Sequence, residues 1–483
     1  MTKDPPRTLL RAASECLARE ALRRRDFLRA GVAAAGIAAV DAPAFGAPLR
    51  RPGPLRVLVP KGCEANLAPV VERFRARTGA AVELESTPVD DVATVLMLRS
   101  LGADSAPIDV ALPATFTIPD LVEAGALQPL PGSAADDDSN ALYTLGDRYR
   151  GATWGYQTDG DVYLMFYRRD WLEDDAIRRR FEDRFEEPLQ VPRTWEELDR
   201  TLEFFHAPDE GRFGGALFRT PSYIAWEFWT RLHGKGLFPV TDDMTPLLDA
   251  DEAVAAGEEL VAASRWLQPG ARVDGLFENW SAYRRLDVFC NIGWGGSQKA
   301  FNGEGSPLRG RLAHGPTPGG VLAGTARPIS YFNWGWNYTV PRSAAQPELA
   351  AEFARFATLG EAATEAVRAP GGFFDPFRSE HYADEEVRSV YSPEFLEVHE
   401  ASMRSAVPDF YLAGRGRYFD VLGRFLDRAN RGELEVRRAL ELVAKAWERI
   451  TESEGRERQV ARWLELKARY PEPLRSVLRS ERA

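Results

Sequence analysis

The chain has 483 residues, of which 44% are hydrophobic, and its formal net charge is −11. This length is too great for one compact core and is typical of two or three domains. Residues 1–44 hold eight basic and five acidic side chains, a net of +3, which leaves −14 for the remainder. An acidic body argues against nucleic acid and anionic membranes as partners, and no apolar run reaches the roughly 20 residues of a membrane-spanning helix.

The amino-terminal segment has the three parts of an export signal. Arginines at 23–25 precede an Ala/Gly-rich stretch over 30–40, and small residues follow up to position 46. The letters RRDFL resemble a twin-arginine motif, and the apolar stretch is only weakly hydrophobic. We therefore expect residues 1–46 to be an export signal and linker, cleaved after Ala44 or Gly46, and the mature protein to be periplasmic. The alternative is an amphipathic surface helix.

Export would leave two cysteines, Cys63 and Cys290. A disulfide between them is compatible with the periplasm. We favour two isolated buried thiols, because a free cysteine often serves as a small apolar filler. The chain has no C-x-x-C motif and no Cys/His cluster with zinc spacing.

The segment after the signal alternates between apolar strands and amphipathic helices. The pattern predicts strands over 55–60, 81–87 and 108–113, and helices over 66–78, 91–103 and 116–125. This order predicts a parallel, doubly wound α/β sheet, in which ligands bind beyond the carboxyl ends of the strands. Lys61, after the first strand, and Thr115 and Phe116, after the third, are therefore candidate ligand contacts.

The remainder of the chain is also mixed, and its last hundred residues are mostly helical. Asp170 with Glu173, and Thr194 with Glu197, have the spacing of helix-capping pairs. The pattern predicts a strand over 162–166, a strand over 287–293 that breaks at a glycine turn, and helices over 195–205, 220–234, 346–359, 418–430 and 436–450.

The stretch YFNWGWNYTV, residues 331–340, is the most unusual one. Its alternation predicts a single β-strand with Phe332, Trp334, Trp336 and Tyr338 on one face. Flat rings beside amides suit a sugar or polyol, because rings stack on apolar C–H faces and amides bond hydroxyls. The alternative is a strand whose rings only fill a core.

Catalytic motifs are weak. There is no H-E-x-x-H, G-x-S-x-G, Walker A or G-x-G-x-x-G. Asp159 and Asp161 are a candidate carboxylate pair for a secreted glycoside-acting enzyme. Glu380, His381 and Asp384 offer metal-ligating groups, but adjacent residues do not share a helical face, so we interpret them as a chance cluster. We expect no cofactor and no metal.

The order of the segments resembles the periplasmic solute-binding proteins of ABC importers, in the carbohydrate-type family that includes maltodextrin-binding proteins. The stretches that carry the resemblance are LRVLVPKG, IDVALPATFTIPDLVEAGALQPL, TDGDVYLMFYRRDWL, PRTWEEL, GWGGS, WGWNYTVPRSAAQPELAAEFARFA and ALELVAKAWERI. The resemblance implies two doubly wound α/β lobes joined by a hinge, with extra carboxyl-terminal helices. Lobe 1 would hold 53–160 with 316–370, and lobe 2 would hold 161–315 with 371–483. The chain would cross between them around Asp161–Phe166, near His314 and near Gly371–Phe377.

The resemblance also implies a function and a site. The protein would capture a sugar, polyol or similar solute between its lobes, without catalysis, and would deliver it as a monomer to a membrane permease. Asp161 takes the place of an acidic hinge residue that bonds ligand hydroxyls. The other residues implied to touch the ligand are Lys61, Thr115, Phe116, Tyr223, Trp226, Trp294, Gly295, Trp336, Arg378 and Tyr411.

Two features depart from the family pattern. Phe116 stands where maltodextrin-binding proteins carry an acidic residue, and the chain continues beyond Ile450. Two alternatives stay open: an enzyme that uses Asp159 or Asp161, and the same fold with an amine or organic acid as its ligand.

Overall fold

The largely apolar run over residues 55–60 forms the central strand of a parallel sheet. The computed structural model describes residues 53–100, 107–132, 140–285 and 287–482. In it β1 (Leu55–Pro60) lies between β2 (Val82–Thr87) and β3 (Val110–Ala111), and both neighbours run parallel to it. The connecting helices are α2 (Glu64–Thr78) and α3 (Val92–Ser100), followed by α4 (Ile118–Glu123). The predicted strand and helix order is confirmed.

Residue alternation along β1 explains why both faces of this sheet are covered. Val57 and Val59 share a core cluster with Leu67 and Phe74 of α2. Leu58 belongs to a second cluster with residues of α3 and α4. Successive side chains of a strand point to opposite faces, so a strand with apolar residues on both faces requires a helix layer on each side. Gly79 ends α2 in a left-handed conformation with φ 75°, as its position predicts.

The second sheet has six strands. Its order is β15 (Val407–Pro408), β13 (Tyr331–Phe332), β7 (Val162–Arg168), β9 (Asp287–Gly293) and β8 (Arg212–Ala216), with β10 (Leu312–Pro316) also paired to β7. Four shorter strands form two further pairs, namely β4 (Arg148–Tyr149) with β5 (Ala152–Thr153), and β11 (Gly320–Leu322) with β12 (Thr325–Arg327). All seven residues of β7 are buried, which fits a central strand.

The prediction of one continuous strand over 331–340 is wrong. The stretch forms two short strands, β13 in the six-stranded sheet and β14 (Asn337–Tyr338), which pairs with β6 (Tyr156–Gln157). Between them Gly335 has φ 70°, a left-handed conformation that breaks the extended chain. Thr339 then bridges to Ala111 of β3. The decapeptide therefore carries the chain from one sheet to the other.

The crossing expected near His314 is not at that residue. His314 pairs with Phe166 in the middle of β10, and β13 still pairs with β7. The chain thus stays with the six-stranded sheet as far as Phe332. The crossing between the sheets that was expected around Asp161–Phe166 lies just before that range, in the segment between β6 and β7.

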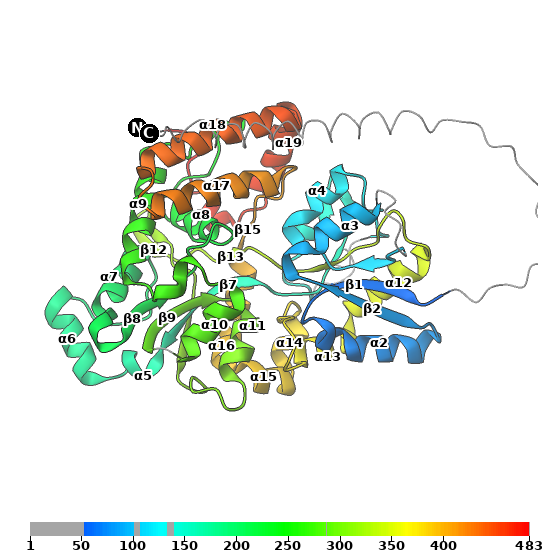
Figure 1. Cartoon of the computed structure of the whole chain (residues 1–483), viewed down its shortest axis with the longest axis horizontal. Helices are drawn as coiled ribbons and strands as arrows, with labels where there is room; N and C mark the ends of the chain where they lie inside the picture. Colours follow the sequence, from blue (N-terminus) through cyan, green and yellow to red (C-terminus); the bar gives the residue numbers. More distant parts are fainter. Residues whose placement is uncertain (1–52, 101–106, 133–139, 286, 483) are drawn as a thin grey trace, which may run out of the picture. The chain divides into compact units, whose positions relative to one another are not determined.

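Helices cover the six-stranded sheet and extend from it (Figure 1). Those that contact its strands are α5 (Arg169–Leu172), α7 (Trp195–Phe205), α10 (Leu276–Arg285) and α16 (Pro393–Ser405). The others are α6 (Asp175–Phe185), α8 (Ile224–Gly234), α9 (Asp251–Ala263), α11 (Gly295–Asn302), α14 (Ser379–Ala383) and α15 (Glu385–Tyr391). Helices α12 (Pro347–Ala357) and α13 (Gly360–Arg368) pack instead on α2 beside the first sheet, and α12 also contacts β3.

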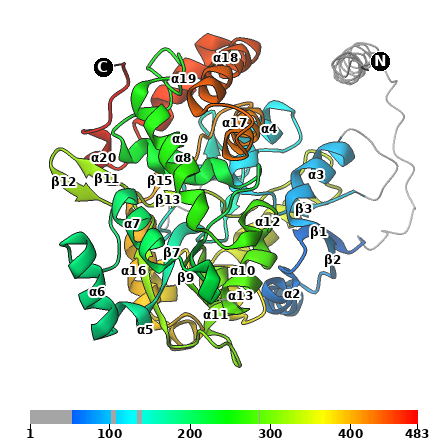
Figure 2. The ribbon, with the colours of Figure 1, turned by 60° about the vertical axis from the view of Figure 1, so that its left-hand side comes forward.

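The last four helices form a layer of their own. They are α17 (Arg415–Asn430), α18 (Val436–Glu454), α19 (Arg456–Lys467) and α20 (Glu472–Arg475). Figure 1 and Figure 2 both place α18 beside α17, and α17 also packs against α8 and α4. Residues 53–483 form one compact unit by contacts, and one hydrophobic cluster includes residues of both large sheets.

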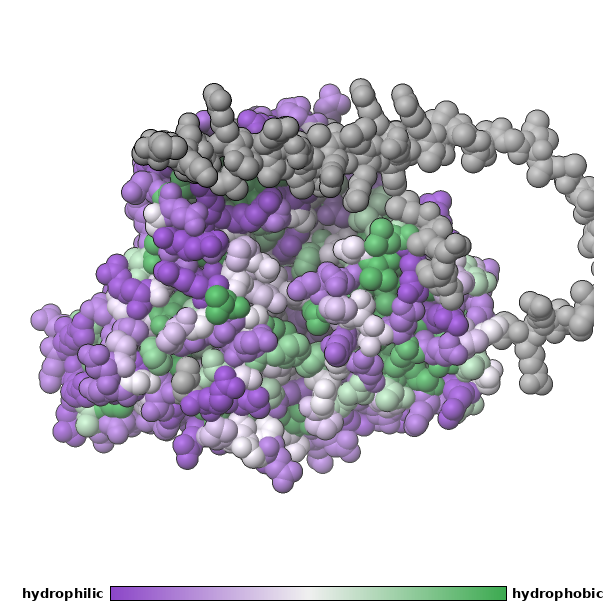
Figure 3. All heavy atoms as spheres, in the orientation of Figure 1, coloured by the Kyte–Doolittle hydropathy of each residue, from purple (hydrophilic) through white to green (hydrophobic). Residues whose placement is uncertain are grey.

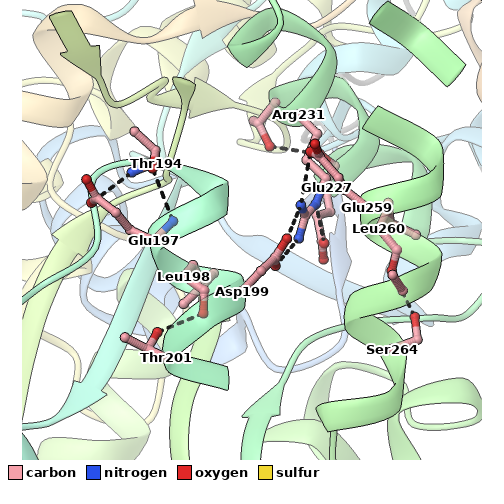
Figure 4. Close-up of polar contacts among 12 residues, drawn as sticks. Thr194, Glu197, Leu198, Asp199, Thr201, Glu227, Arg231, Glu259, Leu260 and Ser264 are labelled. Atoms are coloured by element: carbon pink, nitrogen blue, oxygen red, sulfur yellow. Dashed lines mark hydrogen bonds and ion pairs between the residues drawn. The ribbon is translucent and has the colours of Figure 1, made fainter. Parts of the chain in front are cut away.

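One of the two predicted helix-capping pairs is confirmed. Thr194 and Glu197 form a complete capping box at the start of α7, visible in Figure 4. The prediction of the other pair, Asp170 with Glu173, is wrong. Arg168 donates two hydrogen bonds of 2.9 and 2.7 Å to the Asp170 carboxylate, which therefore does not cap a helix. Asp174 caps α6 instead, accepting from the amides of Ala176 and Ile177 at 2.9 Å each.

A buried charge cluster joins α7 to α8. The Glu227 carboxylate accepts from Arg219 at 2.6 and 3.1 Å and from Arg231 at 2.9 Å. Arg231 also donates to Asp199 at 2.7 and 2.8 Å, and Figure 4 shows Asp199, Glu227 and Arg231 meeting between the helices. Two guanidinium groups thus face two carboxylates, so the cluster is neutral.

The surface and the two cysteines match the sequence analysis. Figure 3 shows hydrophilic residues over most of the visible face, with hydrophobic residues in small separate groups. Within the described ranges, no helix is long and apolar enough to span a membrane. Cys63 and Cys290 are both buried free thiols. The predicted export signal over 1–46 lies outside the described residues.

Candidate functional site

The turn before β7 brings two carboxylates to the passage between the sheets. Asp159 and Asp161 flank Gly160, where an added Cβ would lie 2.0 Å from the Pro376 carbonyl oxygen. Only glycine allows this close approach of two chain segments. The His399 Nε2 atom lies 2.9 Å from the Gly160 carbonyl oxygen, which fixes the turn further.

A third carboxylate joins them from the loop after α13. Oxygen atoms of Asp159, Asp161 and Asp375 all lie within 4.8 Å of one another, and all three residues are buried. The Asp375 amide donates to Asp159 Oδ1 at 2.6 Å, and the Gly335 amide donates to Asp161 Oδ2 at 3.2 Å. The Tyr391 hydroxyl donates to Asp375 Oδ1 at 3.0 Å. Asp159 Oδ2 and Asp375 Oδ2 have no hydrogen-bond partner among the described residues.

Burial and mutual repulsion dominate the electrostatics of this cluster. Burial raises the pKa of Asp159 and of Asp161, and the neighbouring carboxylates raise both further. Burial also raises the pKa of Asp375, against the charge of Lys299. Burial lowers the pKa of Lys299 to about 8, and its ammonium group donates to the Ala369 and Phe374 carbonyls at 3.1 and 2.9 Å. The cluster is therefore short of positive charge.

Helix α11 begins directly at the carboxylate cluster. An added Cβ at Gly295 would lie 2.4 Å from Asp375 Cγ, so glycine is required there. The amide of Gly296 bonds the Asp375 carboxylate and holds its pKa down. The amino-terminal end of this helix, which favours anions, is thus occupied by a side chain of the protein itself.

An aromatic pocket opens next to Asp161. The cavity itself has a volume of about 40 Å³. Its lining residues are Val89, Asp161, Leu276, Phe277, Trp280, Trp294, Gly296, Trp334, Trp336 and Phe373. Asp161 supplies the charge in this lining, and six aromatic rings supply most of the rest. This combination of rings and one carboxylate is suited to a small polar ligand.

Trp294 belongs to both the pocket and the core. Its indole Nε1 donates to Asn333 Oδ1 at 2.8 Å, and its ring centroid lies 4.9 Å from that of Tyr163. Trp226 and Trp334 meet it edge-on at 5.8 and 6.2 Å. Only 5% of its surface is exposed. The ring is therefore held in a fixed orientation by its neighbours.

Three of the residues predicted to touch a ligand line this pocket, namely Asp161, Trp294 and Trp336. Gly295 was also predicted, but its neighbour Gly296 lines the pocket instead. Tyr223 and Trp226 pack behind Trp334, with ring centroids 6.4 and 5.3 Å away. Lys61 is exposed and lies outside the lining.

The remaining predicted residues have structural partners. Thr115 is fully buried and donates to Asn337 Oδ1 at 2.6 Å. The Arg415 guanidinium lies 3.9 Å from the Phe116 ring centroid, and the Tyr411 hydroxyl lies 3.1 Å from that of Tyr143. Arg378 is buried in an ion pair with Glu380.

The predicted chance cluster at 380–384 separates in the structure. Glu380 pairs with Arg378, and Asp384 pairs with Arg368 while it caps α15. His381 Nδ1 accepts from the Phe377 amide at 3.3 Å. The three side chains thus serve separate structural roles.

Sequence reasoning missed Phe277, Trp280, Phe373 and Asp375. Phe277 and Trp280 are three residues apart, so they share a face of α10 toward the pocket. That aromatic spacing was the available signal. Phe373 and Asp375 lie in the stretch GGFFDPFR, from which the resemblance suggested Arg378 instead.

Solved structures share this fold. Maltose-bound MalE3 of Thermotoga maritima has a TM-score of 0.67 and 19% identity, over 82% of this chain and 99% of that one. An ABC transporter solute-binding protein from Agrobacterium vitis with bound D-mannitol has a TM-score of 0.68 and 16% identity, over 84% and 99%. One from Agrobacterium radiobacter in complex with ribitol has a TM-score of 0.68 and 16% identity, over 82% and 98%. The fold is that of type II periplasmic binding proteins, as the sequence predicted.

Comparison with curated proteins gives no match. The family model for bacterial extracellular solute-binding proteins matches residues 64–364, which is more than half of the chain. This range includes most of both large sheets, Asp159, Asp161 and four of the tryptophans around the pocket. The chain belongs to the bacterial extracellular solute-binding protein family.

Proposed function

We propose that this protein is the periplasmic substrate-binding component of an ABC importer and that it captures a sugar, polyol or similar polar solute. The observation that carries the proposal is the aromatic pocket beside Asp161, at the passage between the two sheets. Stacking on tryptophan rings and charge-assisted bonds to a carboxylate are the two contacts that a polyhydroxylated ligand needs. The structural neighbours with bound maltose, mannitol and ribitol support this ligand class.

The lobes that we propose follow the strand pairing. Lobe 1 holds 53–160 together with about 336–370, and lobe 2 holds 161–332 together with 371–483. The stretch 333–335, around Gly335, then acts as one hinge strand and the turn 158–161 as another. Asp161 accepts from the Gly335 amide, so both hinge segments meet at the ligand pocket. A ligand that binds there is positioned to hold the lobes closed.

We expect a matching sugar or polyol to raise the melting temperature and to close the protein. A ligand at 100 times its Kd stabilises the folded state by about 2.7 kcal/mol. A thermal-shift screen over sugars and polyols identifies the ligand. Small-angle scattering with that ligand at saturation should then show a smaller radius of gyration. An unchanged radius despite confirmed binding would contradict the hinge-closing mechanism.

The same screen tests the enzyme alternative. Asp159 is fully buried behind Asp161, so it is not placed to flank a glycosidic bond. We propose that the protein binds without turnover. Chromatography of the ligand after long incubation should recover it unchanged, and a hydrolysed glycoside would overturn this part of the proposal.

The export signal remains a proposal as well. We expect the protein recovered from the periplasm to begin shortly after Ala44 or Gly46, because small residues follow the weakly hydrophobic stretch there. Mass spectrometry of the amino terminus measures this. Replacing Arg24 and Arg25 by lysine should block export. Intact residues 1–44 on periplasmic protein would show that the segment is not a cleaved signal. We further propose that the mature protein acts as a monomer that docks on a membrane permease.

A further inference from the structure

We infer that the solute carries a positive charge as well as hydroxyl groups, as an amine-bearing sugar or polyol does, and that its ammonium group binds at Asp161. This inference rests on the proposed function and narrows its ligand class. Four observations carry it: the charge imbalance behind the pocket, the rings around it, the unpaired indole N–H groups and the occupied helix terminus.

The charge imbalance is the first step. Asp159, Asp161 and Asp375 bring three carboxyl groups within 4.8 Å of one another in a buried place. Lys299 is the cation whose charge acts on Asp159 and Asp375, and its hydrogen bonds go to main-chain carbonyls. A buried charge is costly unless it is paired. The raised pKa values of Asp159 and Asp161 reflect this lack of partners. A cationic ligand at Asp161 would stabilise the ionised form, whereas a neutral polyol would not.

The pocket provides the route to this charge. Asp161 belongs both to the carboxyl cluster and to the pocket lining, so a ligand reaches the cluster through it. Around it stand the rings of Trp294, Trp334 and Trp336. The faces of aromatic rings attract cations, tryptophan most strongly. Rings alone would also suit a neutral sugar, so the carboxyl cluster is what discriminates between the two.

The indole N–H groups indicate that the ligand also carries oxygen atoms. Trp280 and Trp334 line the pocket and are 6% and 7% exposed. Within the described ranges, neither Nε1 has a hydrogen-bond acceptor. Buried donors are normally paired, so a ligand oxygen that reaches either N–H group would supply a missing acceptor. A ligand with hydroxyl oxygens and an ammonium group satisfies the donors and the carboxylate together.

The helix terminus argues against an anionic solute. In a solute site, the start of a helix such as α11 is a natural place for a carboxylate or phosphate. Here the Asp375 carboxyl group lies against Gly295 in the first turn, where an added Cβ would be 2.4 Å from its Cγ, and it fills that position. An acidic ligand would meet three carboxyl groups and no free helix terminus.

The test compares matched ligands on the mature protein. D-glucose, D-glucosamine and N-acetyl-D-glucosamine share one skeleton, and D-glucitol with 1-amino-1-deoxy-D-glucitol forms a second series. We expect the amine to bind at least tenfold more tightly than the hydroxyl compound in one series, measured by calorimetry at pH 7 with EDTA present. N-acetylation should return the affinity to the level of the hydroxyl compound, because it removes the charge.

Asp161→Asn tests the residue itself. We expect it to weaken amine binding at least tenfold and binding of the hydroxyl analogue less than threefold. Folding should survive, because the substitution removes one of three clustered negative charges and asparagine still accepts from the Gly335 amide. Glu278→Gln is the matched control: it removes an exposed carboxylate next to Phe277 at the pocket rim and should change amine affinity less than threefold.

The outcomes separate this inference from the proposed function. Equal or tighter binding of the neutral compounds would overturn the inference and leave the proposed function standing. No binding in either series would count against both. Binding of a hydroxyl-free amine as tight as that of the amino sugar would remove the sugar part of the inference. A larger rise in melting temperature with CaCl2 or MnCl2, abolished by EDTA, would assign the carboxyl cluster to a metal ion instead.

Discussion

Trp294→Ala is expected to lower the free energy of unfolding by about 3–5 kcal/mol and to abolish measurable ligand binding, because the same ring serves core and pocket. The side chain packs on Tyr163, Trp226 and Trp334 and is 5% exposed. Its removal leaves a cavity and takes the indole donor away from Asn333 Oδ1. Urea unfolding followed by circular dichroism measures the loss.

Two further variants separate packing from hydrogen bonding. Trp294→Phe keeps most of the ring but loses the N–H group, and we expect a cost of about 1–3 kcal/mol. Leu464→Ala, at a 43% exposed position on α19, should stay within about 0.5 kcal/mol of the parent protein. If Trp294→Ala binds ligand weakly but unfolds like the parent, then the ring only lines the pocket and the core role is wrong.

Glu227→Ala is expected to destabilise the protein by about 3–5 kcal/mol, because it leaves the buried Arg219 guanidinium without its carboxylate partner. Arg219 and Arg231 are at most 1% exposed. Burial alone would raise the pKa of Glu227, but these two guanidiniums hold it below its ordinary value, so the carboxyl group is ionised. Asp199 pairs with Arg231, and among the described residues no ion pair joins it to Arg219, so it cannot replace Glu227.

The matched control is Glu196→Ala in the neighbouring helix α7. Glu196 also pairs with an arginine, Arg200, at 2.9 Å, but its side chain is 79% exposed. An exposed pair contributes about 0–1 kcal/mol, since water and salt screen it. The loss of unfolding free energy, measured by thermal and urea unfolding, should therefore be several-fold larger for Glu227→Ala than for Glu196→Ala. Equal small losses would mean that solvent reaches the Glu227 cluster.

The strands and helices could be predicted where a local pattern requires them. The run Leu55–Pro60 is apolar except for the half-buried Arg56 and has buried residues on both faces, so it forms a central strand. Thr194 and Glu197 form hydrogen bonds with the main-chain amides at the start of α7, so this cap depends only on local spacing. The failed pair at Asp170 shows the limit of this reasoning. Arg168 donates to the Asp170 carboxylate, which is then not available to the amides of a helix start. Local spacing does not show which of these donors a carboxylate accepts from.

The binding site could be predicted only in part. Asp161, Trp294 and Trp336 were identified from the family resemblance, and the strand start and the glycine turn supported the choice of Asp161 and Trp294. Asp375 could not be found in this way. Its role depends on a loop that approaches Gly160 and Gly295 within van der Waals distance, from more than 200 residues away in one case. A single sequence does not reveal such approaches.

By itself, the sequence determined the parallel order of the first sheet, the helical carboxyl-terminal part, the family resemblance and the acidic character of the body, because these depend on residue type and local spacing. The tertiary structure decided that the decapeptide 331–340 bends at Gly335 and connects two sheets rather than forming one strand. It also decided that three aspartates meet behind an aromatic pocket. Both depend on which distant segments pack together, and packing is set by the shape and charge of the whole interior rather than by any local pattern.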